Sequence, residues 1–276
     1  MLSKLRATAE ARIPRMFAYS CLVFDRLAAR NPDSEVNLLP LFVAPGDRAC
    51  DVGANRGLFT YWLLRNGVTV TAFEPNPHMV EVLRRRFSGS LARGALRIVE
   101  SAASNAPGTA TLHIPEGFSP LATLEHDLAA AGAPLEDVEV KLTRLDDTVS
   151  GDVAFIKVDV EGHEMKVLGG ATRILAASRP TILVEAEERH RAGAVASLRA
   201  LLEPMGMRGF FRDGQAIVPI ARFDVARHQR RDALNAEGTR VLPGRTYVNN
   251  FIFAGRPQVI ARLEALNAQS PISPVN

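Results

Sequence analysis

The sequence is poor in cysteine, with only Cys21 and Cys50 among its 276 residues. Two cysteines cannot build the disulfide framework of a small secreted domain, and they do not form a zinc-binding cluster. Cys50 falls in an apolar segment, where a free thiol behaves as a small hydrophobic side chain. The scarcity of cysteine favours a protein of the reducing cytoplasm and argues against a zinc site.

Long apolar runs and an excess of one charge sign are missing as well. The first residues are interrupted by Lys4, Arg6, Glu10, Arg12 and Arg15, so they contain neither a signal-peptide core nor a membrane span. Across the chain, 33 Lys and Arg face 30 Asp and Glu, a net charge of +3. We therefore expect a cytoplasmic protein without a transmembrane segment, and no nucleic-acid partner.

Hydrophobic residues are plentiful, at 47% of the chain, which is enough to bury one large core. From residue 48 onward, short apolar segments alternate with helical patterns. The expected strands are 49–52, 68–73, 96–100, 153–158 and 181–185, and the expected helices are 58–66, 77–87, 164–177 and 192–202. This alternation predicts an α/β fold with a doubly wound, mostly parallel sheet.

Two regions depart from the alternation. Residues 105–150 are expected to form an insertion, with extended segments at 109–114 and 138–142 on either side of a stretch that includes 121–130. Near the end of the chain, two further strands at 208–211 and 247–253 are expected to give the sheet an antiparallel C-terminal edge.

The ends of the chain fall outside the alternating pattern. Residues 2–30 predict one or two helices broken near Pro14. We therefore divide the chain into an N-terminal helical extension, a main domain and a C-terminal helix or tail, with the bounds 1–45, 46–256 and 257–276.

A glycine-containing turn, Asp51-Val-Gly-Ala-Asn-Arg-Gly57, joins the first expected strand to a helix. Gly53 and Gly57 would let the backbone approach a ligand at the positive end of that helix. A dinucleotide-binding turn has a further glycine where Asn55 stands. With Asp51 before it, the turn suits a ligand that carries an ammonium and a carboxylate, such as the methionine part of S-adenosylmethionine (SAM). The alternative is an ordinary turn with Asn55 as the helix cap.

An acidic residue, Glu74, ends the second expected strand, within Phe73-Glu74-Pro75-Asn76-Pro77. A carboxylate at this place can accept hydrogen bonds from both hydroxyls of a ribose. It can equally stabilise the N-terminus of the helix that begins at Pro77, and the two roles are compatible. We assign Glu74 and Pro75 to a cofactor site.

Ionisable residues also follow the next two core strands. In Phe155-Ile-Lys-Val-Asp-Val-Glu-Gly-His-Glu164, the carboxyl end of the strand delivers Asp159, Glu161 and His163 to the ligand crevice. Each of these three is a candidate general base, and Asp159 is also a candidate for cofactor contact. The alternative is that one of Glu161 and Glu164 caps the following helix.

Glu185 and Glu187, after the last parallel strand, are candidates for contact with the substrate, although Glu187 could equally be a solvated residue before the next helix. Asp159 with Glu161 or Glu185 could supply hard oxygen ligands to a divalent cation. The spacing permits such an ion without requiring it, so we assign no metal site.

Taken together, the motifs resemble the FkbM family of SAM-dependent methyltransferases, from Asp51 to about Glu187. Besides the segments quoted above, the matching text comprises Ser101-Ala-Ala-Ser104, Leu145-Asp146-Asp147, Val167-Leu-Gly-Gly-Ala171, Pro180 and Leu183-Val-Glu185. The resemblance implies a class I methyltransferase sheet of the Rossmann-like type over residues 46–256. It also implies O-methylation of a hydroxyl on a sugar, a glycan or a secondary metabolite.

The resemblance further implies how SAM is held. Gly53, Asn55 and Gly57 would lie against the methionine half, Glu74 would hold the ribose, and Ser101-Ala102 would lie near the adenine. The acceptor would be a small molecule or glycan, and assembly into a homo-oligomer stays open.

Three alternatives remain. An NAD-dependent oxidoreductase would share the sheet and the ribose-binding acid, but it should show the further glycine. An RNA methyltransferase would use a basic surface of Arg222, Arg227, Arg230, Arg231 and Arg240, yet no aromatic platform accompanies these residues. A non-catalytic SAM-binding scaffold would keep the fold and lose turnover, which the intact acidic cluster from Asp159 to Glu164 argues against.

Overall fold

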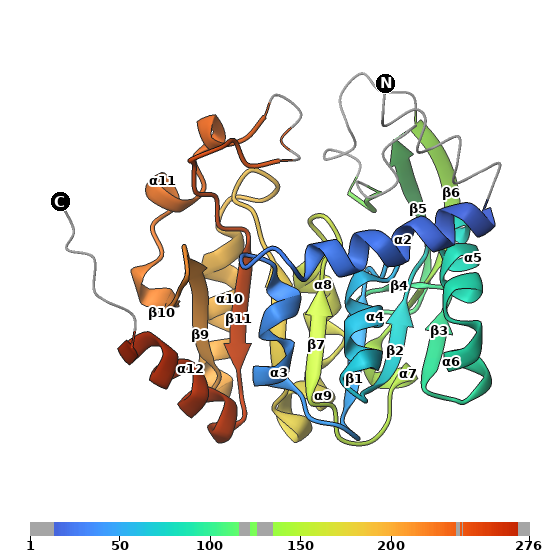
Figure 1. Ribbon diagram of the computed structural model, residues 1–276, viewed down its shortest axis with the longest axis horizontal. Helices are drawn as coiled ribbons and strands as arrows, with labels where there is room; N and C mark the ends of the chain where they lie inside the picture. Colours follow the sequence, from blue (N-terminus) through green and yellow to red (C-terminus); the bar gives the residue numbers. More distant parts are fainter. Residues whose placement is uncertain (1–13, 116–121, 126–134, 236–237, 239, 270–276) are drawn as a thin grey trace.

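Eight strands form one twisted sheet at the centre of the molecule (Figure 1). The structure, a computed structural model, describes residues 14–115, 122–125, 135–235, 238 and 240–269. In order across the sheet, the strands are β10 (Ala216–Pro219), β9 (Arg208–Asp213), β11 (Asn250–Ala254), β8 (Thr181–Glu185), β7 (Phe155–Val158), β1 (Arg48–Val52), β2 (Thr69–Phe73) and β3 (Leu96–Val99).

The strand directions confirm the predicted doubly wound, mostly parallel sheet. β3, β2, β1, β7 and β8 are parallel, whereas β11 is antiparallel to both of its neighbours, β8 and β9. The sheet ends with β10, which pairs antiparallel with β9. Between β1 and β7 the strand order reverses, so the connections leave in opposite directions and open a crevice at the carboxyl ends of the two strands.

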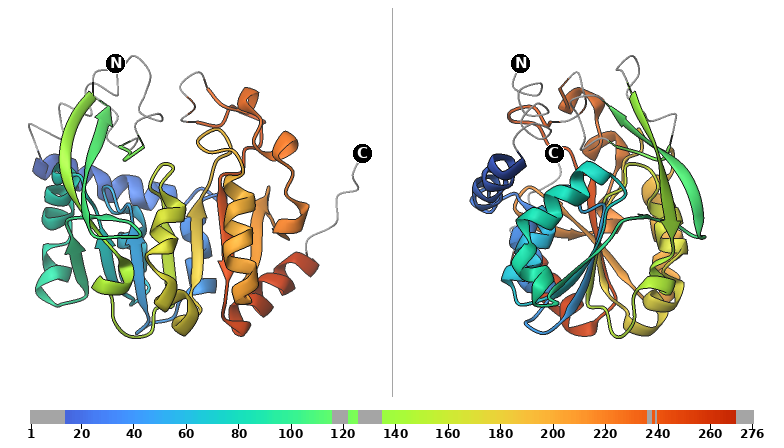
Figure 2. Two further views of the ribbon diagram at one scale, coloured as in Figure 1. Left: turned by 180° about the vertical axis from the view of Figure 1, so that it is seen from behind. Right: turned by 90° about the vertical axis from the view of Figure 1, so that its right-hand side faces the viewer.

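Helices cover both faces of the sheet in two layers (Figure 2). One layer consists of α3 (Leu39–Phe42), α4 (Leu58–Arg65), α5 (Pro77–Arg86), α6 (Ser88–Ala92) and α12 (Pro257–Gln269), and the other of α7 (Leu145–Thr148), α8 (Glu164–Gly169), α9 (Thr172–Ser178) and α10 (Ala194–Leu202). Each layer encloses its own apolar core. Phe155 and Ile156, neighbours on β7, belong to different cores. The strand is therefore covered on both faces, as its apolar sequence requires.

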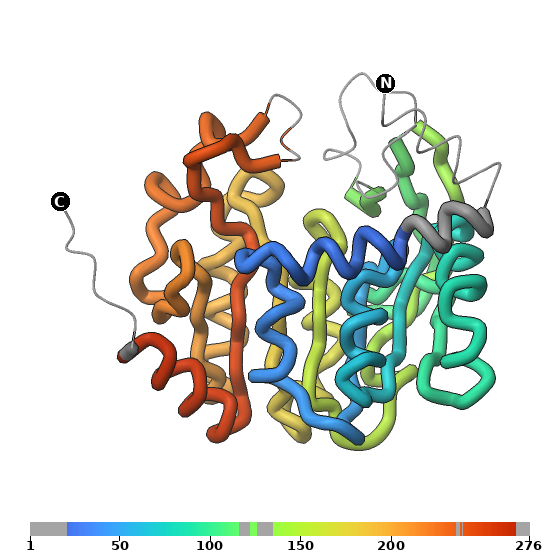
Figure 3. Tube along the Cα trace, in the orientation of Figure 1, coloured from blue at the N-terminus to red at the C-terminus, as the bar shows by residue number. Residues whose placement is uncertain are grey.

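A longer helix, α2 (Pro14–Ala28), crosses the first helical layer, as the chain trace in Figure 3 shows. Its Cys21 packs against Met79 and Val82 of α5, and its Asp25 forms a buried ion pair with Arg86. The description of this helix begins at Pro14, so the expected break near that residue and the prediction on residues 2–13 are not tested by the described residues. At the other end, α12 occupies most of the segment 257–276 that was expected to be a helix or tail, and residues 270–276 also lie outside the described residues.

The expected insertion supplies two strands, β5 (Gly108–Pro115) and β6 (Leu135–Thr143), to a second, three-stranded sheet of order β4-β6-β5. The third strand, β4 (Ala102–Ala103), directly precedes the insertion. These strands confirm the extended segments predicted at 109–114 and 138–142. Thr123 forms an isolated bridge with His113 of β5, which brings residues 122–125 against the small sheet. The small sheet extends beyond the carboxyl ends of the central strands (Figure 1).

One expected helix, 164–177, is two helices in the structure. The break between α8 and α9 lies at Gly170, where an added Cβ would be only 2.0 Å from the backbone oxygen of Ser104. This close approach of the insertion to the helix requires glycine, and glycine also weakens the helix at that point.

Strand β10 was absent from the prediction. It follows β9 through the turn Asp213-Gly214, with Gly214 at a φ of 61°. The Asp-Gly pair is a hairpin signal that could have revealed it, but the strand is short and ends in proline. β10 therefore occupies the outer edge, and β11 lies inside the sheet.

The remaining described elements are short: η1 (Glu35–Leu38), η4 (Glu203–Met205), η5 (Ile220–Arg222), α11 (Val225–His228) and η6 (Arg231–Ala233). Among the described helices, none combines the length and the apolar character that crossing a membrane would need.

Candidate active site

The turn after β1 is shaped by contacts within the protein. Gly53 has a φ of 77°, and a Cβ there would lie 1.8 Å from the backbone oxygen of Asp159. Gly57 has a φ of 86° and begins α4, and a Cβ there would lie 2.6 Å from the ring of Phe87. Both positions therefore require glycine. Only Gly53 lines the pocket described below, whereas Gly57 faces the α5–α6 side.

Glu74 fastens this turn to the end of β2. One of its carboxylate oxygens accepts the backbone N–H of Asn55 at 2.6 Å, and the other accepts that of Asn76 at 2.9 Å. Burial raises the pKa of Glu74 to about 7. Asn55 adopts a left-handed φ of 51°, and its side-chain oxygen accepts the N–H of Arg56. The N–H groups of Gly53 and Ala54 donate to the backbone oxygen of Phe73, and those of Asn55 and Arg56 are thus occupied by side-chain oxygens.

A pocket of about 560 Å³ opens at the carboxyl ends of β1, β2 and β7. Gly53, Asn55, Glu74 and Pro75 line one side of it, and the insertion supplies an apolar wall. The full lining is Val52, Gly53, Asn55, Phe73, Glu74, Pro75, Ala102, Ala103, Leu112, Ala122, Leu124, Asp159, Val160, Glu161 and His163. Most of the residues assigned from the sequence to a cofactor site or to catalysis meet in this pocket.

Besides Gly57, two further residues assigned to the cofactor site, Asp51 and Ser101, lie outside this lining. Asp51 is buried within β1 and accepts a hydrogen bond from the hydroxyl of Thr60 at 2.6 Å. Burial raises its pKa to about 6. Ser101 precedes Ala102, which does line the pocket. Asp51 therefore supports the turn from beneath, rather than facing the pocket directly.

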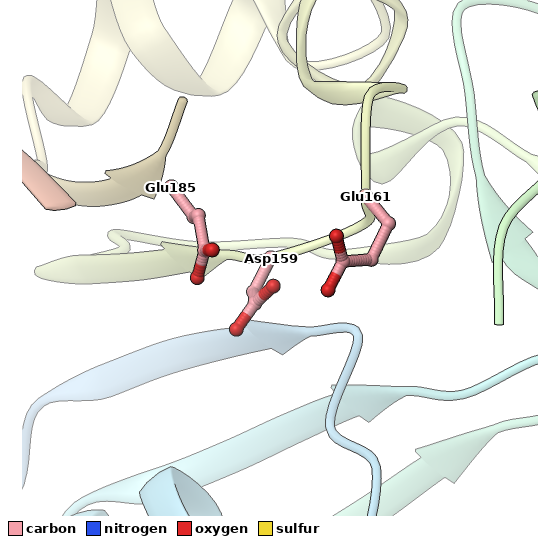
Figure 4. A group of neighbouring side chains, drawn as sticks. All are labelled: Asp159, Glu161 and Glu185. Carbon is pink, nitrogen blue, oxygen red and sulfur yellow. The ribbon is translucent and has the colours of Figure 1, made fainter. Parts of the chain in front are cut away.

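Three carboxylates converge beside the pocket, as Figure 4 shows. Asp159 and Glu161 lie on the loop after β7, and Glu185 ends β8. One oxygen of each lies within 4.8 Å of the others, and this is the one group of at least three potential metal ligands found so close together in the described part of the chain. Asn249 donates a hydrogen bond to Glu185 at 2.7 Å. Burial and then repulsion from Asp159 raise the pKa of Glu185 well above its usual range.

Lys157 lies beneath these carboxylates and was not singled out from the sequence. Its side chain is only 3% exposed, and its Nζ is 3.6 Å from Oδ2 of Asp159. Lysine is almost never fully buried without a partner. A lysine in the apolar strand Phe155–Val158 was the signal that could have found it.

His163 lines the pocket with both ring nitrogens already engaged. Nε2 is 3.0 Å from the hydroxyl of Ser104, and Nδ1 is 2.7 Å from a carboxylate oxygen of Glu125. Burial lowers the pKa of His163. The imidazole thus links α8 to the insertion. Neither nitrogen is free in this arrangement to accept a proton from a ligand in the pocket.

Glu187 is similarly occupied. It is buried, and its two oxygens accept hydrogen bonds from the guanidinium of Arg189 and the hydroxyl of Tyr247. Burial opposes ionisation, but the hydrogen bonds from Arg189 and Tyr247 outweigh it and lower the pKa of Glu187. The arrangement joins the loop after β8 to the segment before β11.

Glu161→Gln is expected to raise the melting temperature at alkaline pH and to leave it nearly unchanged at acidic pH. Burial, followed by repulsion from Asp159, raises the pKa of Glu161 from 4.5 to about 8. Between these values the folded protein keeps a proton that the unfolded chain has released, so stability falls as the pH rises. Glutamine has no such proton to lose. Thermal unfolding should show a gain of about 2–4 °C at about pH 8, as expected for ~1 kcal/mol.

The matched control for this experiment is Glu136→Gln, which changes an exposed carboxylate in the insertion. It should melt with the same pH dependence as the unchanged protein. An equal gain for Glu161→Gln at about pH 5 and at about pH 8 would contradict the assignment, because the gain would then come from packing.

The comparison with known families decides the identity of the chain. Residues 51–210, more than half of it, match the family described as "Methyltransferase FkbM domain". The chain belongs to the FkbM methyltransferase family. The match begins near the end of β1 and ends in β9, so it includes every residue that lines the pocket. This confirms the family resemblance and supports methyltransferase activity.

Individual members extend the comparison. The 31-O-demethyl-FK506 methyltransferase FkbM of Streptomyces tacrolimicus is 31% identical over 194 residues, which are 59% of this chain and 73% of that protein. Methyltransferase 1 of Beauveria bassiana (strain ARSEF 2860) is 30% identical over 141 residues, 44% of this chain and 56% of that protein. This chain thus spans little more than half of the second protein.

Among solved structures, Methyltransferase FkbM from Methylobacillus flagellatus KT is similar with a TM-score of 0.49 and 17% identity. The similarity covers 76% of this chain and 44% of that one, so the chain spans less than half the length of that structure.

Proposed function

We propose that the chain binds SAM in the pocket at the ends of β1 and β2 and transfers its methyl group to a hydroxyl of a small molecule or glycan. The main support for this proposal is the position of Glu74, a buried carboxylate on the pocket wall at the end of β2. Each of its oxygens accepts one backbone N–H, and each has a further lone pair for a ribose hydroxyl.

The remaining pocket residues fit the other parts of SAM. The apolar side chains of Ala102, Leu112 and Leu124 suit an adenine ring, and Gly53 offers a flat backbone surface to the methionine part. A pyrophosphate fits poorly, because the N–H groups of Asn55 and Arg56 already donate to side-chain oxygens. The pocket therefore favours SAM over a dinucleotide.

When bound, SAM supplies a sulfonium methyl group for an in-line displacement by the acceptor oxygen. The acceptor hydroxyl must lose a proton as its oxygen forms the new bond, and we assign this proton to Asp159. Asp159 lines the pocket, its side chain is 36% exposed, and the ammonium group of Lys157 lies 3.6 Å from its Oδ2. His163 is less suited because both of its nitrogens are engaged.

Glu161 and Glu185 lie next to Asp159, and we assign them to binding of the acceptor. Burial and repulsion from Asp159 raise the pKa of both carboxyl groups and so favour their protonated forms, in which each can donate one hydrogen bond as well as accept. Such groups suit an acceptor with several hydroxyls. The name of the Streptomyces relative, a 31-O-demethyl-FK506 methyltransferase, supports transfer to an oxygen. Glu187, whose oxygens are occupied, would act on the acceptor only through Arg189 or Tyr247.

Calorimetric titration with SAM, S-adenosylhomocysteine (SAH) and NAD tests the cofactor. We expect dissociation constants of about 1–100 μM for the two adenosyl ligands and no binding of NAD, with or without magnesium. Binding of NAD alone would contradict the proposal. With SAM bound, transfer of its labelled methyl group to polyhydroxylated acceptors then tests the reaction. SAM binding without transfer to any acceptor would favour a non-catalytic scaffold.

A further inference from the structure

Lys157 is buried where a positive charge needs a specific partner. It is the third residue of β7, and its side chain is 3% exposed. The Nζ atom lies 5.3 Å from the centre of the Phe59 ring on α4, donates to Oδ1 of Asn250 at 3.2 Å, and is 3.6 Å from Oδ2 of Asp159. The ammonium group thus lies beneath the cluster of three carboxylates formed by Asp159, Glu161 and Glu185.

A chain of hydrogen bonds joins this lysine to the far side of the cluster. Asn250, which accepts from Lys157, donates to Oδ1 of Asn249 at 3.2 Å, and Asn249 donates to Glu185 at 2.7 Å. The chain crosses from β7 to the start of β11 and back to β8. Lys157 is therefore connected both to Asp159 directly and to Glu185 through two amides.

The carboxylate cluster already has a positive charge beside it, the ammonium group of Lys157. Burial would lower the pKa of Lys157, but the surrounding carboxylates, Asp159 first and Glu185 next, raise it, so the ammonium stays charged. The ammonium faces Asp159 directly, at 3.6 Å, and it reaches Glu185 through the amides of Asn250 and Asn249. A divalent cation among the three carboxylates would be repelled by Lys157 at close range.

We propose that Lys157 is the built-in counter-ion of the Asp159–Glu161–Glu185 cluster and that it positions Asp159 for proton removal, so that methyl transfer needs no divalent cation. The inference rests on the proposed function for the step that Asp159 performs. The counter-ion role itself stands on the geometry of the cluster and can be measured without an acceptor. Lys157 acts through Asp159, so it is a positioning residue.

Titration of SAH-loaded protein with Mn²⁺, followed by electron paramagnetic resonance, tests the counter-ion role. The unchanged protein should bind no Mn²⁺ below about 1 mM, whereas Lys157→Met should bind it at least about tenfold more tightly, because three carboxylates then lack a cation. Methionine keeps the length and the apolar stem of the lysine. Lys166→Met is the matched control, since it removes an exposed lysine of α8 that pairs with Glu125, and it should gain no Mn²⁺ affinity.

Binding of Mn²⁺ below about 1 mM by the unchanged protein would overturn the proposal. This measurement uses no variant, so it does not depend on whether a variant folds. Unchanged Mn²⁺ affinity in a Lys157→Met protein that still binds SAH would overturn it as well.

The positioning role is tested once an acceptor is known. We expect EDTA to leave turnover unchanged, and Lys157→Met to lower kcat by about tenfold or more with KM for SAM within about threefold. Asn250→Leu, which keeps the lysine and removes its amide partner, should lower kcat less. Loss of activity with EDTA and its recovery with Mg²⁺ would overturn the proposal. If no acceptor is methylated, the proposed function fails, and the Mn²⁺ result still decides the counter-ion role.

Discussion

Glu74→Ala is expected to lower the affinity for SAH by about 100-fold or more, because it removes an acceptor from both ribose hydroxyls, at ~1.5 kcal/mol or more each. Alanine also frees the N–H groups of Asn55 and Asn76, which Glu74 now satisfies. The turn after β1 therefore loosens at the same time. Calorimetric titration of both proteins with SAH measures the combined effect.

A ligand that lacks the ribose hydroxyls separates the two causes. The unchanged protein should bind 2′,3′-dideoxy-SAH much more weakly than SAH, whereas Glu74→Ala should bind the two ligands almost equally. Glu81→Ala, which alters an exposed acid on α5 that pairs with Arg85, is the matched control and should bind SAH normally. If the variant still prefers SAH to the dideoxy ligand as strongly as the unchanged protein does, Glu74 does not hold the ribose.

Asp159→Asn is expected to lower kcat by about 10²–10⁴-fold, the usual contribution of a general base, while SAH affinity changes by less than about threefold. The amide keeps the shape of the side chain and cannot take up the acceptor proton. The measurement is turnover at saturating SAM together with calorimetric binding of SAH. Asp152→Asn, in the loop before β7, is the matched control because that carboxylate is 71% exposed and pairs with Arg256.

Variants of Glu161 and His163, the other two candidate bases, test whether Asp159 is the base. Glu161→Gln should lower kcat by less than about tenfold, since the carboxyl group of Glu161 already carries a proton near neutrality. His163→Gln should spare SAH binding and affect turnover through the loosened insertion, because the imidazole bridges Ser104 and Glu125. A larger loss in either variant than in Asp159→Asn would transfer the role of base to that residue.

The architecture of the central sheet was accessible from the sequence because its signals are local. Apolar strands alternate with helical segments, and turn residues such as Gly53 and Pro77 mark their junctions. Glu74 and Asp159 could be placed at the ligand crevice for the same reason, since each directly follows a parallel strand. The division into an extension, a main domain and a C-terminal helix or tail remains a prediction.

The partners of the site residues were not accessible in the same way, because they lie far away in the sequence. Ser104 and Glu125, which engage His163, are 59 and 38 residues from it, and Tyr247 is 60 residues from Glu187. A pattern within one segment cannot show which donor will meet which acceptor. The sequence therefore placed His163 and Asp159 on equal terms as bases, and only their contacts separate them.

Local patterning and side-chain chemistry were thus sufficient for the fold class and the acids at the strand ends, because periodicity and turn residues act over a few neighbours. Tertiary structure alone decided that Gly57 faces Phe87, that Lys157 lies beneath the carboxylates, and that β11 enters the sheet between β8 and β9. Burial and close approach depend on which distant segments pack together, and they change the charge and availability of each group.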